Sequence, residues 1–168
     1  SLNILTLNGG QVAQGGVADI QVTVGNTGPG NINANKVRAQ ISVPSSLVST
    51  LPNAQQTGLP PGWTITVNSG SSITVCNGSD VIPAGVQRQV FIKVQGNNLG
   101  GPSTVNGSLI FSSGTSCTVP GTLPGDQTAD NTATTSIQVI AAPACSIGVS
   151  ASAGSILCNG GTTTLTAT

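Results

Sequence analysis

The chain has 168 residues and is almost uncharged, with four basic side chains, four acidic ones and no histidine. Charged residues make up 5% of it, against about 25% in an average soluble domain. A formal net charge of zero excludes the basic surface that binds nucleic acid, and no polybasic segment is present to attach the chain to an acidic membrane. Ser, Thr, Asn, Gln and Gly must keep the molecule soluble, a composition typical of secreted fibres and stalks.

Alternation of apolar and polar residues begins at the N-terminus. Leu2, Ile4 and Leu7 predict a short first strand that ends in a glycine turn. The clearest pattern of the chain follows in residues 16–30, where four apolar residues alternate with polar ones before a Gly/Pro turn: Ala18, Ile20, Val22 and Val24. A period of two residues places one face of a strand in a core and the other face in water.

The same pattern recurs along the chain. Further strands are predicted in residues 36–43, 63–67, 73–76, 86–94, 105–111 and 133–139. Residues 45–62 and 117–131 are predicted to be long connections. With no convincing helical period, about eight strands at this spacing predict an all-β protein with a sandwich architecture.

The last part of the chain differs from the rest. We expect one β-sandwich over residues 1–142, and a linker with the start of a following β repeat or a donor strand over 143–168. Residues 145–168 are too few to enclose a core, because an isolated hairpin is marginally stable at best. We therefore expect them to pack on another copy or on the next module through four apolar side chains: Ile147, Val149, Ile156 and Leu165.

The ends of the sequence suggest a segment of a longer mature protein. It starts at Ser1 without a signal peptide. No apolar run approaches the roughly 18 residues that a membrane span needs, so we expect no insertion into a membrane.

The four cysteines are Cys76, Cys117, Cys145 and Cys158, which allow three disulfide pairings. Without histidine or a C-x-x-C motif, a zinc site has no suitable spacing. Disulfides formed in an oxidising compartment are favoured. Order along the chain favours Cys76–Cys117 and Cys145–Cys158, although the sequence alone leaves the connectivity open.

Catalytic chemistry has few candidates in this sequence. No histidine can act as a base for a serine, and the chain contains no glutamate. Hydrolysis by paired carboxylates would require Asp126 and Asp130, the only two that lie close in sequence, to face a cleft. We therefore predict that the chain is not an enzyme.

Asp126, Asp130 and Asn131 form a weak calcium candidate, because they place hard oxygen ligands in one loop. The alternative, which we favour, is that Asp130 and Asn131 cap the turn before the last strand through side-chain-to-backbone hydrogen bonds. We expect no required cofactor. A second possibility typical of surface fibres is a Lys–Asn isopeptide crosslink. Lys36 and Lys93 are its candidate amines and Asp19 is the nearest strand-borne acid, but the chain has no glutamate and no family motif for such a crosslink.

Trp63, the only tryptophan, lies in an alternating strand, which predicts a core position rather than a sugar-binding platform. Asn77-Gly78-Ser79 and Asn106-Gly107-Ser108 match the glycosylation sequon. We interpret both matches as accidental.

Four motifs occur in order: VTVGNTGPG, LPPGWTITV, IPAGVQRQVFIKV and ADNTATTSIQV. Together they resemble the N-T-G / L-P-x-G repeat domain of bacterial surface proteins, over about residues 1–140. The tail ACSIGVSASAGSILCNGGTTTLTAT resembles the Cys-Asn-Gly-Gly repeats of Bacteroidota gliding-type surface adhesins, which the type IX secretion system exports.

This resemblance implies an immunoglobulin-like sandwich on the bacterial cell surface, without catalytic residues. We expect a structural stalk or filament unit whose partners are neighbouring copies or modules of the same protein. The alternative is an adhesive module that binds a carbohydrate or a surface with its loops.

Overall fold

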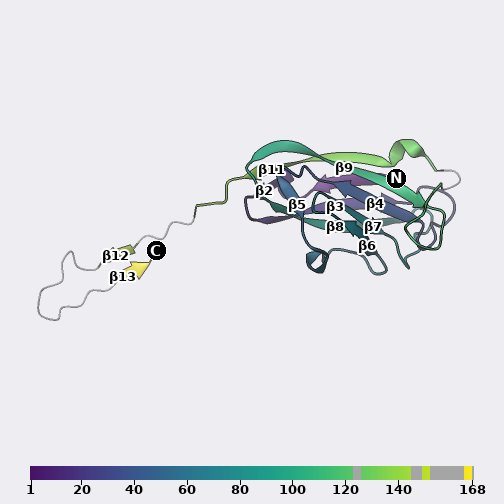
Figure 1. The fold of residues 1–168 in the computed structure, drawn as a ribbon, viewed down its shortest axis with the longest axis horizontal. Helices are drawn as coiled ribbons and strands as arrows, with labels where there is room; N and C mark the ends of the chain where they lie inside the picture. Colours follow the sequence, from purple (N-terminus) through teal and green to yellow (C-terminus); the bar gives the residue numbers. More distant parts are fainter. Residues whose placement is uncertain (123–125, 145–148, 152–164, 168) are drawn as a thin grey trace, which may run out of the picture.

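The computed structural model describes residues 1–122, 126–144, 149–151 and 165–167, the last two ranges as backbone only. Two sheets pack face to face in a β-sandwich (Figure 1). The first sheet has the strand order β1-β3-β8-β5, and the second has the order β2-β11-β9-β4-β7-β6, with β10 attached to β9. The predicted all-β sandwich is therefore confirmed.

The first sheet contains β1 (Leu2–Thr6), β3 (Val17–Gly25), β5 (Val48–Thr50) and β8 (Gln87–Gly96). The second sheet contains β2 (Gln11–Ala13), β4 (Val37–Ser42), β6 (Thr64–Asn68), β7 (Ser72–Cys76), β9 (Gly100–Ser112), β10 (Pro120–Gly121) and β11 (Thr132–Ile140). Three single turns of 3-10 helix lie between them: η1 (Asn8–Gly10), η2 (Asn53–Gln55) and η3 (Thr128–Asp130). No helix in the described part of the chain is long and apolar enough to cross a membrane.

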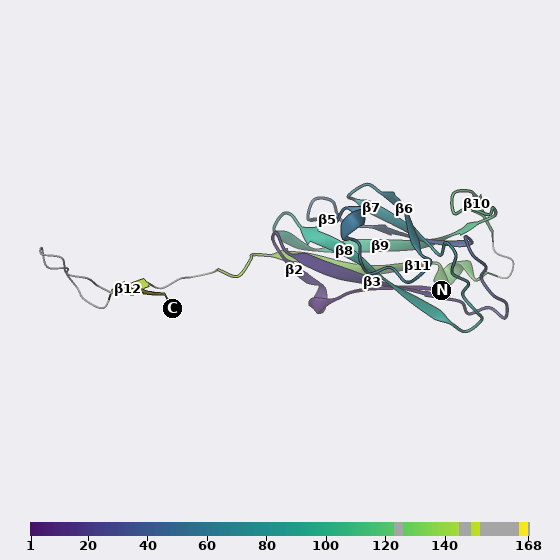
Figure 2. The same cartoon turned by 90° about the horizontal axis from the view of Figure 1, so that it is seen from below.

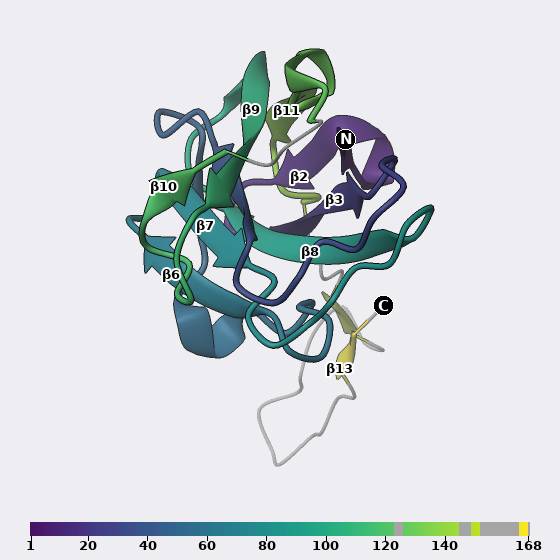
Figure 3. The same ribbon diagram turned by 90° about the vertical axis from the view of Figure 1, so that its right-hand side faces the viewer.

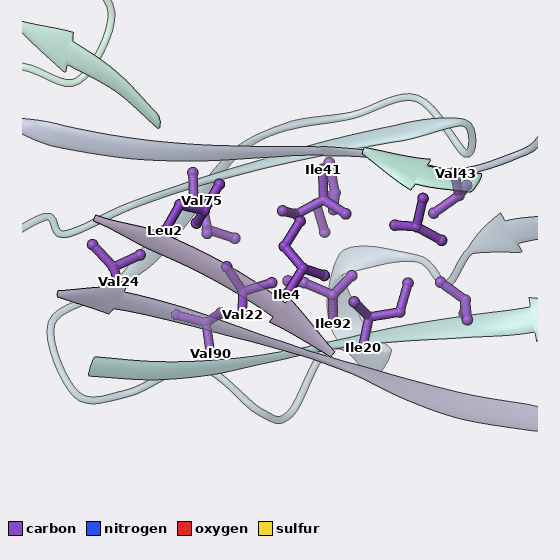
Figure 4. Close-up of a cluster of buried hydrophobic side chains, with 14 of the residues drawn as sticks. Leu2, Ile4, Ile20, Val22, Val24, Ile41, Val43, Val75, Val90 and Ile92 are labelled. Atoms are coloured by element: carbon purple, nitrogen blue, oxygen red, sulfur yellow. The ribbon is translucent and has the colours of Figure 1, made fainter. Parts of the chain in front are cut away.

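The core lies between the two sheets and consists almost entirely of aliphatic side chains (Figure 4). Ile20, Val22 and Val24 of β3 are fully buried, as the alternation of this strand predicts. They face Ile41 of β4 and Val75 of β7 across the sandwich. Each fully buried Ile or Val contributes about 1.5–3 kcal/mol relative to an exposed one, so a core poor in aromatic residues can still stabilise the fold.

One side of the sandwich is closed because the chain changes sheet between β1 and β2. β1 pairs antiparallel with β3, whereas β2 pairs parallel with β11, with Gln11 opposite Gln138 and Ala13 opposite Ile140. The Thr6 hydroxyl donates a hydrogen bond to the Ser136 carbonyl at 2.8 Å and ties the two sheets together there.

The two ends of the sandwich carry different loops (Figures 1 and 2). We call one the loop end; it carries residues 26–36, 77–86, 113–122 and 126–131 and faces the viewer in Figure 3. The opposite end carries residues 8–16, 43–47 and 96–101, and the chain leaves the sandwich there after Ile140. We call it the exit end.

The structure differs from the predicted strands in two respects. β2, β5 and β10 are additional short strands, and β5 lies inside the predicted 45–62 connection. The alternation of the strand predicted over residues 63–67 also breaks near its end. A register shift between Ile65 and Val67 interrupts the alternation, and Val67 is 53% exposed.

In the tail, β12 (Val149–Ala151) and β13 (Leu165–Ala167) form a separate two-stranded antiparallel sheet. Val149 lies opposite Ala167, and Ala151 lies opposite Leu165. The predicted assembly residues Ile147 and Ile156 lie outside the described residues. The division at residue 142 therefore stays a prediction.

Candidate functional site

The loop end gathers most of the charge of the molecule. Six of the eight charged side chains belong to this end or to the strand residues next to it: Lys36, Arg38, Asp80, Arg88, Asp126 and Asp130. The other two, Asp19 of β3 and Lys93 of β8, form a cross-strand ion pair at 2.9 Å. Among the described residues, the loop end is therefore the region to search for a polar functional site.

Asp80 is the centre of the largest polar cluster. Its carboxylate accepts a hydrogen bond from the Trp63 indole at 2.9 Å and two from the Arg88 guanidinium, at 2.8 and 3.1 Å. The Arg88 guanidinium lowers the pKa of Asp80, although burial opposes the shift, and Asp80 in turn raises the pKa of Arg88. Asp80 is therefore an ionised anchor that fixes the buried Trp63, and it is not available as a proton donor at neutral pH.

Asn77 is a fully buried amide whose hydrogen-bonding capacity is completely used. Its Oδ1 accepts from the backbone N–H groups of Lys36 at 2.9 Å and Val37 at 3.1 Å. Its Nδ2 donates to the carbonyls of Asn33 at 2.8 Å and Asp80 at 2.7 Å. The Asn77 sequon is therefore inaccessible in the folded chain, whereas the Asn106 side chain is exposed on β9.

Asn26 likewise holds the turn that follows β3 through hydrogen bonds from its side chain to loop backbone groups. Its Nδ2 donates to the carbonyls of Gly30 at 2.7 Å and Ile82 at 2.9 Å, and its Oδ1 accepts from Gly28 N at 3.2 Å. The Gly85 N–H donates to the Asn26 carbonyl at 2.8 Å. The N-T-G motif and the turn at Gly85 thus meet in space and hold the loop end together.

Sequence reasoning identified these motifs but missed the two buried amides. The available signal was weak: both asparagines directly follow an alternating strand and precede a glycine within two residues. Gly78 adopts φ +36°, and a Cβ there would collide with the Gly62 carbonyl. The LPPG turn and the Asn77-Gly78 turn are therefore in direct backbone contact.

A disulfide fixes the longest loop of this end. Cys76 at the end of β7 is bonded to Cys117, with Cα atoms 6.2 Å apart and a sequence separation of 41 residues. The Lys36 ammonium donates to the carbonyls of Ser113 at 3.2 Å and Gly114 at 2.8 Å. Cys145 and Cys158 lie outside the described residues.

The isopeptide candidates make ordinary polar contacts. Lys36 donates to the two carbonyls above, and Lys93 pairs with Asp19 on a partly exposed sheet face. Asp19, the candidate acid, is therefore engaged in an ion pair with Lys93.

The calcium candidates lie together on and next to η3. The Asn131 amide donates to the Asp126 carboxylate, and Asp130 Oδ1 lies 3.7 Å from the Ser1 amino group. Asn131 is therefore engaged with a side chain, which differs from the side-chain-to-backbone cap expected from the sequence. Over the described ranges, no three His, Cys, Asp or Glu side chains come close enough to hold a metal ion.

A cavity of about 540 Å³ opens beside this cluster, between residues 25–32 and residues 126–127. Leu109 and Phe111 of β9 form its apolar floor and also line a second cavity of about 360 Å³. Asp126 supplies the one carboxylate among the described lining residues. The volume is within the range of small-molecule sites, but a single carboxylate on an apolar floor provides no acid–base pair for catalysis.

Comparisons with known proteins are informative only at the level of the fold. No family model matches the chain, and no curated protein matches it. A cohesin module from a Clostridium perfringens family 33 glycoside hydrolase aligns with a TM-score of 0.55 at 8% identity, covering 82% of this chain and 96% of that one.

Two further solved structures align less closely. A Nocardia farcinica protein with an immunoglobulin-like fold has a TM-score of 0.47 and 16% identity, covering 81% of this chain and 98% of its own. The collagen-binding domain of a Staphylococcus aureus adhesin has a TM-score of 0.45 and 10% identity, with coverages of 82% and 96%. The chain is an immunoglobulin-like β-sandwich, and identities this low say nothing more about it.

Proposed function

We propose that the chain is a non-catalytic extracellular structural module of a bacterial cell-surface adhesin or filament. It acts as a stalk unit that assembles with neighbouring copies or modules of the same protein. The observation that carries this proposal is the path of the chain. β1 starts at the loop end, and β11 delivers the chain to the exit end (Figure 1). Modules joined in series through such ends add their full lengths.

β2, which follows β1, and β11, with which the described sandwich ends, are paired in a way that resists tension. β2 and β11 run parallel, so a force that pulls the N-terminal side and the C-terminal side apart slides one strand along the other. All their hydrogen bonds are then loaded together, including the bond from Gln14 N to Ile140 O at 2.9 Å. An antiparallel pair pulled from adjacent ends would instead open one bond at a time.

The composition and the motifs of the chain support an extracellular location on the cell surface. Few charges, many Ser, Thr and Asn residues and a disulfide suit a secreted fibre. The N-T-G / L-P-x-G motifs and the Cys-Asn-Gly-Gly tail resemble surface repeats, and export by the type IX system belongs to the same proposal. The polar clusters of the loop end support it too, because Asp80, Asn77 and Asn26 are engaged in holding loops together.

Single-molecule pulling tests the proposal. The full chain is attached by its two ends and stretched until the sandwich unfolds. We expect one cooperative unfolding event at high force. A gradual extension at low force would show that the sandwich cannot carry load along its length.

A loop-end binding function is the second candidate, and the cavity over Leu109 and Phe111 is the observation that favours it. In this alternative the module recognises a carbohydrate or another surface ligand with residues 26–32 and 126–131. A glycan array probed with the full chain tests it. Reproducible binding that Asp126→Asn weakens and Asn106→Asp leaves unchanged would favour this alternative, and an array without signal would argue against a glycan ligand.

A further inference from the structure

The second sheet ends in a strand whose outer edge has no backbone partner among the described residues. β6 pairs with β7 alone, and residues 64–67 make no other backbone hydrogen bond within the described ranges. Asn68, at the end of the strand, is already held: its Nδ2 donates to the Leu51 carbonyl at 2.8 Å. The open edge is therefore short and lies in the first four residues of β6.

The corresponding edge of the first sheet is covered. Beside β8, residues 51–58 continue the line of β5: Leu51 N donates to the Lys93 carbonyl and Phe91 N to the Gly58 carbonyl, both at 3.0 Å. The buried Gln56 side chain adds two more contacts to the backbone of Lys93. On the opposite side, the change of sheet between β1 and β2 closes the sandwich. Among the sheet edges in the described part of the chain, the edge of β6 is thus neither covered by a following segment nor closed by a change of sheet.

The edge of β6 has neither charged side chains nor proline to protect it against pairing. Proteins defend exposed edges with charged side chains, proline or bulges. The hairpin of residues 64–79 contains none of the eight charges and no proline, and its one protective feature is the register shift at Thr66. Val67 is 53% exposed next to that shift. Unpaired N–H and C=O groups beside an exposed β-branched side chain favour the addition of a strand.

We propose that β6 pairs antiparallel with β6 of a second copy of this chain, so that two sandwiches share one continuous sheet. A strand that pairs with itself about a two-fold axis forms a closed, self-complementary contact. Both partners are uncharged along this hairpin, and the whole chain has a net charge of zero, so like charges do not oppose the approach.

The position of the cavities argues for a second copy over a foreign peptide. Peptides that add to a sheet edge are selected by pockets that take their alternate side chains. Both loop-end cavities are lined by Leu109 and Phe111 of β9, which lies three strands away from β6 in the sheet order. The β6 edge offers backbone groups, which pair with an extended strand such as β6 itself, while the Thr66 hydroxyl is already bonded to the Thr74 carbonyl at 3.2 Å. This inference goes beyond the stalk role, because modules in series need no lateral partner.

A charge-swap experiment on Val67 in the full chain tests this pairing. Sedimentation velocity is measured for the wild type, Val67→Lys, Val67→Asp and an equimolar mixture of the two variants. In a two-fold pair centred on residues 64–67, residue 67 of each copy lies opposite residue 64 of the other and about 10 Å from residue 67 of the other, a distance over which charges still interact at low ionic strength. Each variant alone should associate at least about tenfold more weakly than the wild type, because its like charges repel, and the mixture should recover association.

Asn106→Lys and Asn106→Asp are the matched controls, since Asn106 is exposed in the middle of the same sheet, between β4 and β11. They should associate like the wild type. A wild type that stays monomeric up to about 1 mM would overturn the proposal. So would variants that associate normally, or a Lys/Asp mixture that fails to recover, since the last result indicates pairing with a different segment. The pulling experiment on single molecules is unaffected by any of these outcomes.

Discussion

The two ends of the sandwich are stabilised by different means. The loop end depends on side chains: the Asp80–Arg88 ion pair, the buried amides Asn26 and Asn77, and a disulfide. The exit end has no charged residue in the described ranges 8–16, 43–47, 96–101 and 138–144. The exit end depends instead on close contacts between backbones. The comparison indicates that the long loops of the loop end are held by specific polar partners, whereas the short turns of the exit end require glycine.

Gly96 illustrates the second mode. A Cβ at this position would lie 2.6 Å from the Ala13 carbonyl oxygen and 3.2 Å from Val139. Gly96 N also donates to the Gly16 carbonyl at 3.0 Å. The turn before β3 and the end of β8 therefore approach each other so closely that no side chain fits between them.

The largest expected effect comes from Asn77→Ala at the loop end. The substitution leaves two N–H groups and two carbonyls without their partner, and the Val37 N–H among them is buried. Each buried group left unsatisfied costs about 1–3 kcal/mol. Partial access of water to the opened site reduces the sum, and we expect a loss of about 4 kcal/mol in the free energy of unfolding. Urea unfolding measures it. Asn106→Ala, on the exposed face of β9, should change stability by less than about 0.5 kcal/mol; equal effects would refute the assigned role of Asn77.

Removal of the Cys76–Cys117 bond is expected to have the next largest effect. A crosslink that closes 41 residues is worth about 3–4 kcal/mol in the chain-entropy model. Cys76→Ala/Cys117→Ala should lose this amount, whereas Cys145→Ala/Cys158→Ala tests the tail separately. In pulling experiments, loss of the bond should also lengthen the unfolded chain by roughly 150 Å. Peptide mapping under non-reducing conditions that finds free thiols at both positions would contradict the pairing.

At the exit end, Gly96→Ala should destabilise the sandwich by about 1–3 kcal/mol, since either the backbone or Val139 must move. Gly30 in the loop-end turn is the control, because a Cβ there meets nothing within 4 Å. Gly30→Ala should therefore be close to neutral in thermal unfolding. A neutral Gly96→Ala would mean that the exit end tolerates separation of these two backbones.

The sequence predicted features that arise from residues close together in the chain and missed those that arise from residues far apart in it. The buried face of β3 followed from alternation within nine residues. β2 and β5 were missed because three-residue strands are too short to alternate visibly, and the register shift before Val67 was missed because it has no local signature. The site was harder still. Asn77 matters because residues 33, 36, 37 and 80 surround it, and its neighbours in sequence do not reveal this.

A smaller effect should distinguish the loop end by its response to pH. The pKa of Asp80 is lowered from its ordinary value of 3.8 by Arg88. A depressed folded-state pKa contributes stability that is present above the unfolded value and is lost as the pH falls through the folded value. Unfolding free energies should therefore fall below about pH 4. In Asp80→Asn the acid-dependent loss should be smaller, and neutral stability should be lower; an unchanged pH profile would argue against the ion pair.

The smallest expected effect is that of chelation. If Asp126, Asp130 and Asn131 hold no structural calcium, EDTA should leave the melting temperature unchanged. Calcium added afterwards should have no effect either. A drop of several degrees in EDTA that calcium reverses would assign a metal to this loop and add an ionic component to the loop end.

The proposed stalk role requires that mechanical load pass from one end of the sandwich to the other through β2 and β11. Gln14→Pro removes the N–H that bonds to the Ile140 carbonyl, while Gln14→Ala keeps it and changes the same exposed side chain. Both variants are pulled by their two ends, and their thermal stabilities are measured alongside. We predict a clearly lower unfolding force for Gln14→Pro than for Gln14→Ala, beyond what their thermal stabilities explain. Equal unfolding forces would contradict the transmission of force through this strand pair.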